Sequence, residues 1–326
     1  MKAAVLFVLA LTGCGRYRDF SLPLQSGAAV VRPEWHPRSD PVLVPGRAGA
    51  WDSGDVLNPS VLKVNGGYLN AYSGFDGTTW RTGLAASTNG LQWTKLGPIL
   101  SPIPGIEPDQ YIAANGALVQ FSGSLNIYYQ AGRTPQIYLA HRISENEWRK
   151  APGAVLSLGP YGSWDERGVA DPYTLEVRGT LYMYYLGMDR ARRQRLGVAM
   201  STDGLTWFKL RSNPIMELGN DRAFDENGLG EPAVWISSGS YWMLYTGRAR
   251  NERRRLGLAR SKDGVHWEKL PEVIEGEQSW NSQVMCDPTV LVEGGRVRVW
   301  FGGGDIARPD ENIHGRIGYG ELILSR

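Results

Sequence analysis

Residues 164–172 have the sequence Trp-Asp-Glu-Arg-Gly-Val-Ala-Asp-Pro. The pattern is an aromatic residue with an acid or amide, then a second polar residue directly before proline. In every copy the aromatic precedes this second polar residue by seven positions, and the pairs are Trp51 and Asn58, Trp164 and Asp171, Phe224 and Glu231, and Trp280 and Asp287. The later copies lie about 60 residues apart and the first gap is about twice as long, which predicts a degenerate copy at Asn115-Gly116. Repeats of this length are typical of propellers and solenoids.

Each unit continues in the same way after its proline. An apolar stretch, a glycine-containing turn, an aromatic-rich stretch such as residues 181–185 and a further apolar stretch follow one another. Ser-x-Asp-Gly-x-x-Trp then recurs at residues 201–207 and 261–267, and its Asp-Gly pair favours a hairpin. This element resembles the Asp-box of sialidases, but its recurrence favours a structural role. Four antiparallel strands per unit and five units predict an all-β, five-bladed β-propeller.

The ring is predicted to close through the N-terminal part of the chain. Residues 38–43 read Arg-Ser-Asp-Pro-Val-Leu and parallel Arg-Ser-Asn-Pro-Ile-Met at residues 211–216. The fifth unit, residues 280–324, offers three strands and no fourth. We therefore expect residues 35–44 to supply its fourth strand and remove an open sheet edge.

The chain of 326 residues carries a net charge of +2, so a nucleic-acid partner is not expected. Residues 1–13 read as a signal peptide, 14–31 as a tether and 32–326 as the propeller domain. A short apolar run precedes Leu11-Thr12-Gly13-Cys14, which resembles a bacterial lipobox. Lipidation of Cys14 would hold an exported protein on the cell envelope, in the periplasm or on the cell surface. The alternative is an ordinary signal peptide with an incidental cysteine.

The polar residues before proline begin the innermost strand of each blade. They should ring one mouth of the central channel, together with the loops between second and third strands; the five positions are Asn58, Asn115, Asp171, Glu231 and Asp287. Crowded carboxylates repel one another, and this raises the pKa of one of them. A proton donor beside an ionised partner is what glycoside hydrolysis requires. Asp and Asn also favour strand starts for structural reasons, whereas Glu231 does not fit that explanation.

The layout from Trp35 onward resembles glycoside hydrolase family 43 and its five-bladed relatives, including the family 32 fructosidases. The resemblance implies that Asp171 tunes the acid and that Glu231 is the general acid. The family's base Asp, at the first blade, is replaced by Asn58. The Asn-Asp-Pro-Asn signature of fructosidases is missing, which argues against family 32 itself. Asp287 is our first choice for a substitute base, and Asp55 and Asp52 follow.

Several other residues are candidates for the funnel. Arg167 and Trp80 could contact a sugar, with Asn58, Asn115 and Asp55 beside them. The resemblance implies a possible structural Ca²⁺ near His314; no cofactor is otherwise required. Two arginine groups, at residues 190–195 and 248–255, could grip an acidic glycan or phosphate. We favour the alternative interpretation, in which these arginines are solvent-exposed residues at hairpin tips.

The first functional hypothesis is an inverting glycoside hydrolase that acts on an oligo- or polysaccharide in the funnel. The alternative is a carbohydrate-binding or polysaccharide-assembly lipoprotein that has lost the base. A third hypothesis is a transferase or phosphorylase whose arginines hold phosphate. We expect a monomer that meets the membrane only through its lipid anchor.

Overall fold

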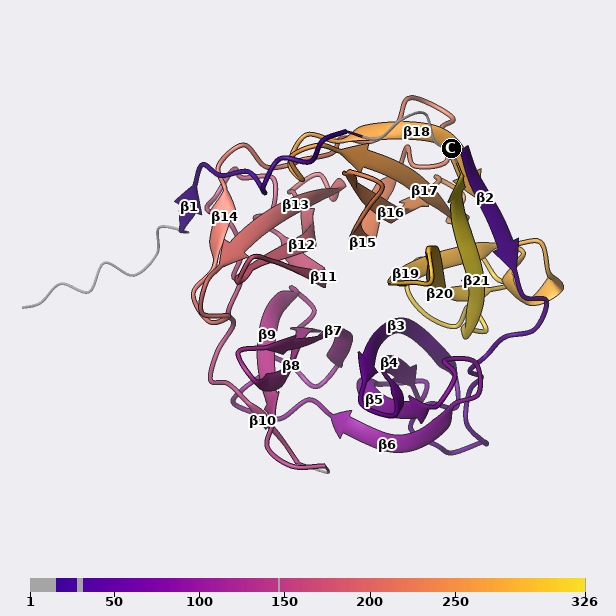
Figure 1. Ribbon diagram of the computed structural model, residues 1–326. Coiled ribbons are helices and arrows are strands. Elements are labelled where there is room, and N and C mark those ends of the chain that lie inside the picture. Colours follow the sequence, from indigo (N-terminus) through magenta and orange to yellow (C-terminus); the bar gives the residue numbers. More distant parts are fainter. Residues whose placement is uncertain (1–15, 28–31, 146, 326) are drawn as a thin grey trace, which may run out of the picture.

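The computed structural model describes residues 16–27, 32–145 and 147–325. It is a five-bladed β-propeller whose blades surround a central axis (Figure 1). The strands of the first three blades are β3 (Asp55–Val64), β4 (Gly67–Phe75), β5 (Trp80–Ser87) and β6 (Thr94–Leu100); β7 (Ile112–Phe121), β8 (Ser124–Ala131), β9 (Gln136–Arg142) and β10 (Trp148–Lys150); and β11 (Gly168–Val177), β12 (Thr180–Met188), β13 (Gln194–Ser201) and β14 (Phe208–Leu210). The predicted fold class is therefore confirmed.

The last two blades complete the ring. The strands of blade four are β15 (Gly228–Ser237), β16 (Ser240–Arg248), β17 (Arg254–Ser261) and β18 (Glu268–Ile274). A short 3₁₀ turn, η1 (Ser279–Asn281), leads into blade five, which contains β19 (Val284–Glu293), β20 (Arg296–Gly304), β21 (Arg316–Ser325) and β2 (Arg32–Pro37). No described segment forms an apolar helix of the length that a bilayer requires.

The ring closes as the repeat predicted. β2 pairs antiparallel with β21, with Trp35 opposite Leu322, so the N-terminal strand is the fourth strand of blade five (Figure 1). The pairing begins three residues earlier than expected, at Arg32. Further along, the Val42 amide donates to the carbonyl of Ile317 at 2.7 Å. The open edge of the sheet is thus covered.

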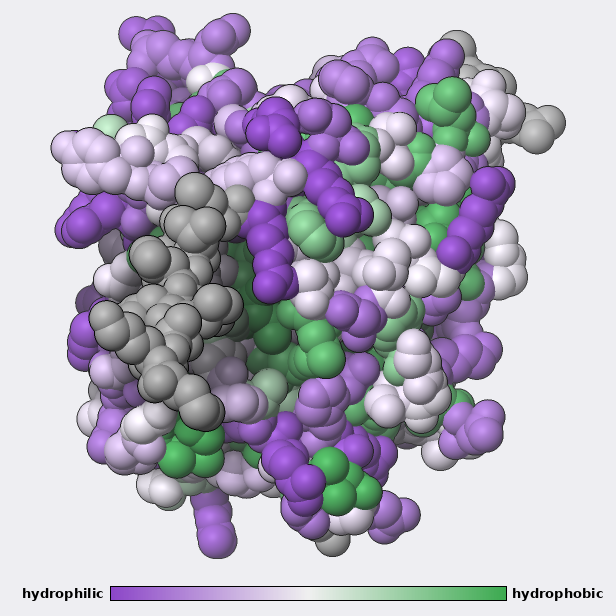
Figure 2. Space-filling view, turned by 90° about the vertical axis from the view of Figure 1, so that its left-hand side faces the viewer, coloured by the Kyte–Doolittle hydropathy of each residue, from purple (hydrophilic) through white to green (hydrophobic). Residues whose placement is uncertain are grey.

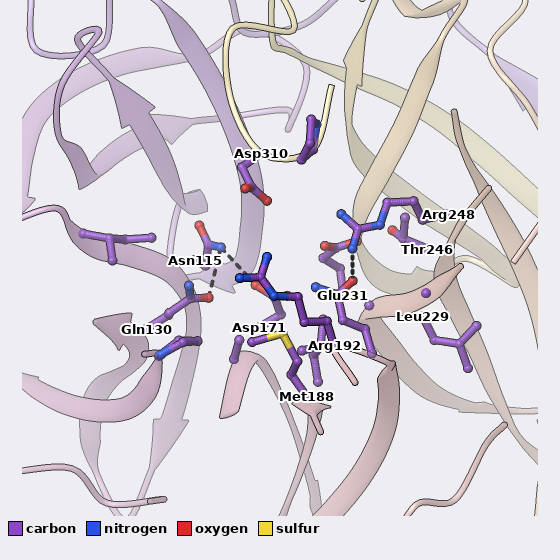
Figure 3. Close-up of a pocket in the computed structure, with 18 of the residues that line it drawn as sticks. Asn115, Gln130, Asp171, Met188, Arg192, Leu229, Glu231, Thr246, Arg248 and Asp310 are labelled. Atoms are coloured by element: carbon purple, nitrogen blue, oxygen red, sulfur yellow. Dashed lines mark hydrogen bonds between the residues drawn. The ribbon is translucent and has the colours of Figure 1, made fainter. Parts of the chain in front are cut away.

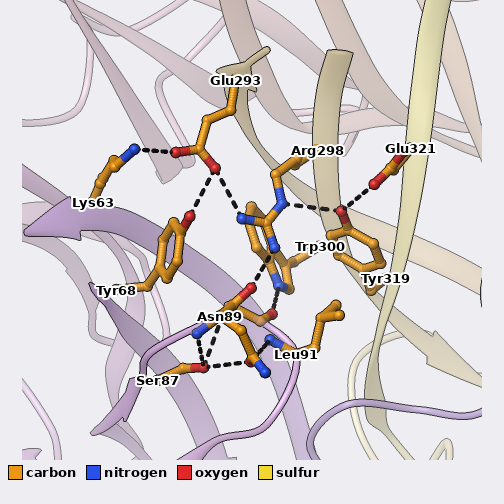
Figure 4. A network of polar contacts seen from close by, with 11 residues as sticks. Lys63, Tyr68, Ser87, Asn89, Leu91, Glu293, Arg298, Trp300, Tyr319 and Glu321 are labelled. Atoms are coloured by element: carbon orange, nitrogen blue, oxygen red, sulfur yellow. Dashed lines mark hydrogen bonds and ion pairs between the residues drawn. The ribbon is translucent and has the colours of Figure 1, made fainter. Parts of the chain in front are cut away.

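Polar contacts also join blade five to blade one, on the face where the Asp-Gly hairpins lie (Figure 4). Glu293 accepts hydrogen bonds from Lys63, Tyr68 and Arg298 at 2.5, 2.9 and 2.8 Å. The Trp300 indole donates to the carbonyl of Gly90, in the hairpin of blade one, at 2.6 Å. These contacts connect blade five, which contains the closing strand, to blade one.

The aromatic of each repeat packs across its own blade. An added Cβ at Gly187 or Gly197 would lie 2.2 and 2.5 Å from the Trp164 ring. Only glycine leaves the ring room to lie on the second and third strands, which explains why glycines recur there. The repeat aromatics are therefore structural.

The acid of each repeat forms a buried ion pair behind the aromatic. Asp165 accepts a hydrogen bond from Lys209 at 2.5 Å and one from Tyr185 at 3.3 Å. Blades one and four repeat this arrangement with Asp52, Tyr72 and Lys95 and with Asp225, Tyr245 and Lys269. In blade two Glu107 takes the place of the aspartate, bonding Tyr129 and Lys150. Asp52 is therefore structural, and the prediction that it could serve as a base is wrong.

The Ser-x-Asp-Gly elements are hairpin supports, as predicted. The Asp203 carboxylate accepts the amides of Leu205 and Thr206 at 2.8 and 2.6 Å, and Ser201 Oγ accepts the amide of Gly204 at 2.9 Å. All these bonds stay within the turn, so the element stabilises the hairpin locally.

The segment expected to be a tether packs in part against the propeller. β1 (Tyr17–Arg18) pairs in parallel with β14, and Leu22 is buried among residues of blades three and four. The outer surface on this side of the ring is mostly hydrophilic, with scattered apolar residues (Figure 2). Residues 16–27 are thus not a free tether, because burying Leu22 favours docking. Cys14 and the signal peptide lie outside the described residues, and lipidation stays a prediction.

Candidate active site

The five blade-start residues share one backbone geometry. Each has a positive φ, from 43° at Glu231 to 52° at Asp287, and each interrupts the register between the first two strands of its blade. This left-handed conformation is uncommon outside glycine and costs free energy. Its recurrence in every blade shows how the fold turns these side chains toward the axis.

A funnel of about 730 Å³ opens above this ring. The loops between second and third strands form its wall, as predicted, and Asn58, Asn115, Asp171, Glu231 and Asp287 all line it. Figure 3 shows Asn115, Asp171 and Glu231 around the cavity. Arg167 and Trp80 also line it. The structure thus brings together all of the predicted catalytic and substrate-binding residues except Asp52 and Asp55.

Asp55, like Asp52, lies outside the funnel. Its carboxylate is fully buried and accepts the amides of Asn312 and Gly315, each at 2.6 Å. Both oxygens are therefore engaged in holding the loop between β20 and β21. The prediction that Asp55 could act as a base or bind substrate is wrong, because this loop folds back over it.

Asp287 is held rigidly at the start of blade five. It is 6% exposed, and its Oδ2 accepts hydrogen bonds from the Asn58 amide at 3.2 Å and from the Cys286 thiol at 3.1 Å. Burial first, and the charge of Glu231 second, raise the pKa of Asp287 to about 7. Because both donors reach Oδ2, Oδ1 stays without a described protein partner.

Asp171 lies on the other side of Glu231 in the ring. It accepts a hydrogen bond at 2.9 Å from Asn115, which also contacts Gln130 (Figure 3). Burial, followed by the charge of Glu231, raises the pKa of Asp171 well above its usual range. Both effects favour the protonated form of Asp171.

Glu231 stands between these two carboxyl groups. Its Oε2 is buried and has no hydrogen-bond partner among the described residues. The charge of Glu231 contributes to the raised pKa values of both Asp171 and Asp287, so the three carboxyl groups interact. Burial and like charge thus favour retention of a proton on the two aspartates.

Four arginines of the two groups reach the funnel, contrary to the expectation of solvated tips; they are Arg190, Arg192, Arg248 and Arg254. Arg254 is 9% exposed, and its Nη2 donates to the carbonyl of Arg308 at 2.7 Å. Burial alone would lower the pKa of Arg254, but Cys286, Glu231 and Asp287 raise it, so its charge is retained. The sequence analysis did not predict that Arg254 is buried. The alternation of side chains along β17 could have indicated it, because Arg254 lies on the same face of the strand as buried Leu256 and Leu258.

Trp80 and His314 have other partners. The Trp80 ring stacks on Phe75 with centroids 4.8 Å apart, and its indole donates to Glu311 at 3.1 Å. One face of that ring is therefore covered. His314 is exposed and pairs with Asp305 at 2.7 Å, away from the residues that line the funnel. Within the described chain, no group of three or more His, Cys, Asp or Glu could hold a metal ion, and the Ca²⁺ near His314 stays a prediction.

Comparison with known families agrees with this geometry. The glycosyl hydrolases family 32 N-terminal domain matches residues 68–294. The chain belongs to this family. The argument against family 32 from the missing motif is thereby overturned. The match begins after Asn58, so the blade start that departs from the pattern lies outside it.

Individual relatives are more distant. An uncharacterized protein of Mycobacterium tuberculosis is 25% identical over 228 residues, which cover 65% of this chain and 75% of that protein. A 1,2-β-oligomannan phosphorylase of Thermoanaerobacter is 27% identical over 130 residues, covering 37% and 43%. A family 117 glycoside hydrolase of Zobellia galactanivorans has a TM-score of 0.68 at 19% identity, with 91% of each chain covered. This last likeness shows the shared fold.

Proposed function

We propose that the protein is an inverting glycoside hydrolase that acts on a glycan in the funnel. One observation carries the proposal: three carboxyl groups from consecutive blades line one cavity, and two of them have raised pKa values. A glycosidase needs an acid and a base within one cleft at the same pH. The family supports glycosidase chemistry in general.

Glu231 donates a proton to the glycosidic oxygen as the bond to the anomeric carbon breaks. Asp287 accepts a proton from the water that attacks this carbon from the opposite face. Its free Oδ1 can take this proton, and its pKa, which is about 7 beside an ionised Glu231, is lower once Glu231 carries the proton that it donates. Asp171, whose raised pKa favours its protonated form, limits the negative charge around Glu231. Asn58, whose side chain cannot take up the proton, holds Asp287 through its backbone amide.

The test is a panel of oligosaccharides assayed for released sugar, with Glu231→Gln as the matched control. Loss of a positioned acid should lower kcat by roughly 10²–10⁴-fold, while binding of the same glycan persists. NMR of the first product should show inverted anomeric configuration. A wild-type protein that binds a glycan without cleaving it would contradict the hydrolase and favour the binding lipoprotein instead.

Phosphorolysis is the second candidate, because Arg167 and Arg192 line the funnel without an ion pair in the part of the chain described here. Arg192 points into the cavity (Figure 3). The phosphorylase relative also favours this candidate. A phosphate oxygen would attack the anomeric carbon while the acid protonates the leaving oxygen, giving a glycosyl phosphate without a carboxylate base. The same panel with inorganic phosphate distinguishes the two reactions by their products.

We also propose export and lipidation of Cys14, on the basis of its sequence context alone.

A further inference from the structure

Blades three and four contain two loops of the same length and shape. Met188 pairs with Gln194 across the loop of blade three, and Arg248 pairs with Arg254 across that of blade four. In both loops the first residue donates its amide to the carbonyl of the fifth, from Asp189 to Arg193 and from Ala249 to Arg253. The loops can therefore be compared residue by residue, with Arg195 matching Arg255.

In blade three a carboxylate joins the two arginines. Asp189 Oδ2 lies 2.8 Å from Nε and 2.7 Å from Nη2 of Arg193, and 3.1 Å from Nη2 of Arg195. Its Oδ1 accepts the Arg193 amide at 3.0 Å. Burial opposes ionisation, but these bonds and charges keep the pKa of Asp189 below its ordinary value. This cluster shows what arginines at these positions bind.

In blade four the carboxylate is missing, because Ala249 stands where Asp189 would be. The Arg253 amide donates to Asn251 Oδ1 at 3.2 Å, and its guanidinium makes one long hydrogen bond, from Nη2 to the carbonyl of Ser282 at 3.4 Å. Its Nε is buried and has no partner within the described chain. Arg255 pairs with Glu275 on its other side at 2.9 Å. The guanidinium of Arg253 thus lacks the ligand that its counterpart has.

A cleft of about 340 Å³ opens at this place, which we call the blade-four arginine cleft. Four arginines and one carboxylate line it, namely Arg222, Arg250, Arg253, Arg255 and Glu226. Glu226 is already engaged, since its Oε2 accepts the Arg222 amide at 2.8 Å and lies 3.5 Å from Arg250 Nε. Asp221 pairs with Arg250 at 3.0 Å and lies 3.8 Å from Arg222 Nε, and Glu275 pairs with Arg255. Among the described residues, Arg253 is therefore the lining arginine without an ion pair.

We propose that the blade-four arginine cleft binds the carboxylate of an acidic sugar, in the place that the Asp189 side chain fills in blade three. A planar guanidinium matches a carboxylate with two parallel hydrogen bonds. The same loop contributes Glu252 and Arg254 to the funnel wall, so one loop separates the cleft from the funnel. An acidic polysaccharide held there is kept at the funnel mouth. The cleft binds its ligand whether or not the funnel catalyses a reaction.

Calorimetric titration tests this site in a Glu231→Gln background, which prevents cleavage of the probe. The probes are a galacturonate trisaccharide, a neutral galactose trisaccharide and inorganic phosphate. Ala249→Asp supplies an internal carboxylate, as in blade three, and should weaken galacturonate binding on the order of 10-fold or more. Arg253→Ala should do the same. Ala249→Asn, of matched size and without charge, should retain most of the affinity.

Unchanged galacturonate affinity in both Ala249→Asp and Arg253→Ala would overturn the proposal. Equal losses in Ala249→Asp and Ala249→Asn would overturn it too, because size alone would then explain the effect. Binding of phosphate without binding of galacturonate would overturn the assignment to a sugar carboxylate. Thermal unfolding of each variant verifies the fold, and Ala249→Asp should unfold no earlier than the background protein.

Discussion

The five residues that begin the blades have the same backbone conformation, but their side chains differ between one half of the ring and the other. Blades three to five begin with Asp171, Glu231 and Asp287, whereas blades one and two begin with Asn58 and Asn115. All five have the same left-handed conformation. The amide half supplies hydrogen-bond donors, from the Asn58 backbone to Asp287 and from the Asn115 side chain to Asp171. The fold thus fixes the direction of these side chains, and residue identity decides whether a blade start presents a carboxyl group or an amide to the funnel.

The largest effect should come from removing a carboxylate of the reactive half. Asp287→Asn cannot accept a proton from water, so kcat should fall by roughly 10²–10⁴-fold. A base acts only when ionised, so activity of the wild type should rise with pH through about 7, the pKa of Asp287. Any residual activity of Asp287→Asn should lack this rise. The pH dependence of kcat measures both effects.

If Asp287→Asn keeps wild-type activity and the same pH profile, Asp287 is not the base. Phosphate-dependent turnover that survives this substitution would support phosphorolysis.

A smaller effect should follow from placing a carboxylate in the supporting half. Asn58→Asp keeps the backbone amide that holds Asp287 but adds a like charge near it. The pKa of Asp287 should therefore rise above about 7, and the rising limb of the pH profile should move to higher pH. Activity at neutral pH should fall a few-fold. Matched pH profiles of both proteins test this, and a limb displaced to lower pH would show that the added carboxylate itself has become the base.

The smallest effect on activity should come from removing the side-chain amide of Asn115. Asn115→Ala removes the hydrogen bond to Asp171, which favours the ionised form of that carboxyl group, so the pKa of Asp171 should rise further. Since the raised pKa of Asp171 already favours its protonated form, activity should change by less than about 10-fold. Steady-state kinetics at pH 7 measure this change. A loss as large as that of Asp287→Asn would assign Asn115 a direct part in the reaction.

The repeat made most of the fold predictable. The spacing of Trp164, Phe224 and Trp280 gave the number of blades, and the echo at residues 38–43 indicated the closing strand. Blade two was harder, because Glu107 lies eight residues before Asn115, whereas Asp165 precedes Asp171 by six. The buried ion pair of Glu107 and Lys150 could be identified only from the structure.

The site was predictable where it belongs to the repeat and not elsewhere. Asp171, Glu231 and Asp287 follow from their position before proline. Asp55 was misplaced because its partners, the amides of Asn312 and Gly315, come from a loop about 260 residues away. No local pattern records such a contact. The place of Arg254 in the funnel wall was not predicted, because the many arginines at residues 248–255 were interpreted as a solvent-exposed hairpin tip and the alternation of buried residues along the strand was not considered.

The closing strand has a consequence for how the protein acquires its structure. β2 pairs with β21, so the ribosome makes one strand nearly 300 residues before its partner. Pairings so distant in the chain form slowly, because the intervening loop must first lose its conformational entropy. Blades one to four can assemble from neighbouring strands while β2 remains unpaired. Ring closure is therefore the late step of folding, and a nascent chain interrupted before β21 would expose β2 as an unpaired edge.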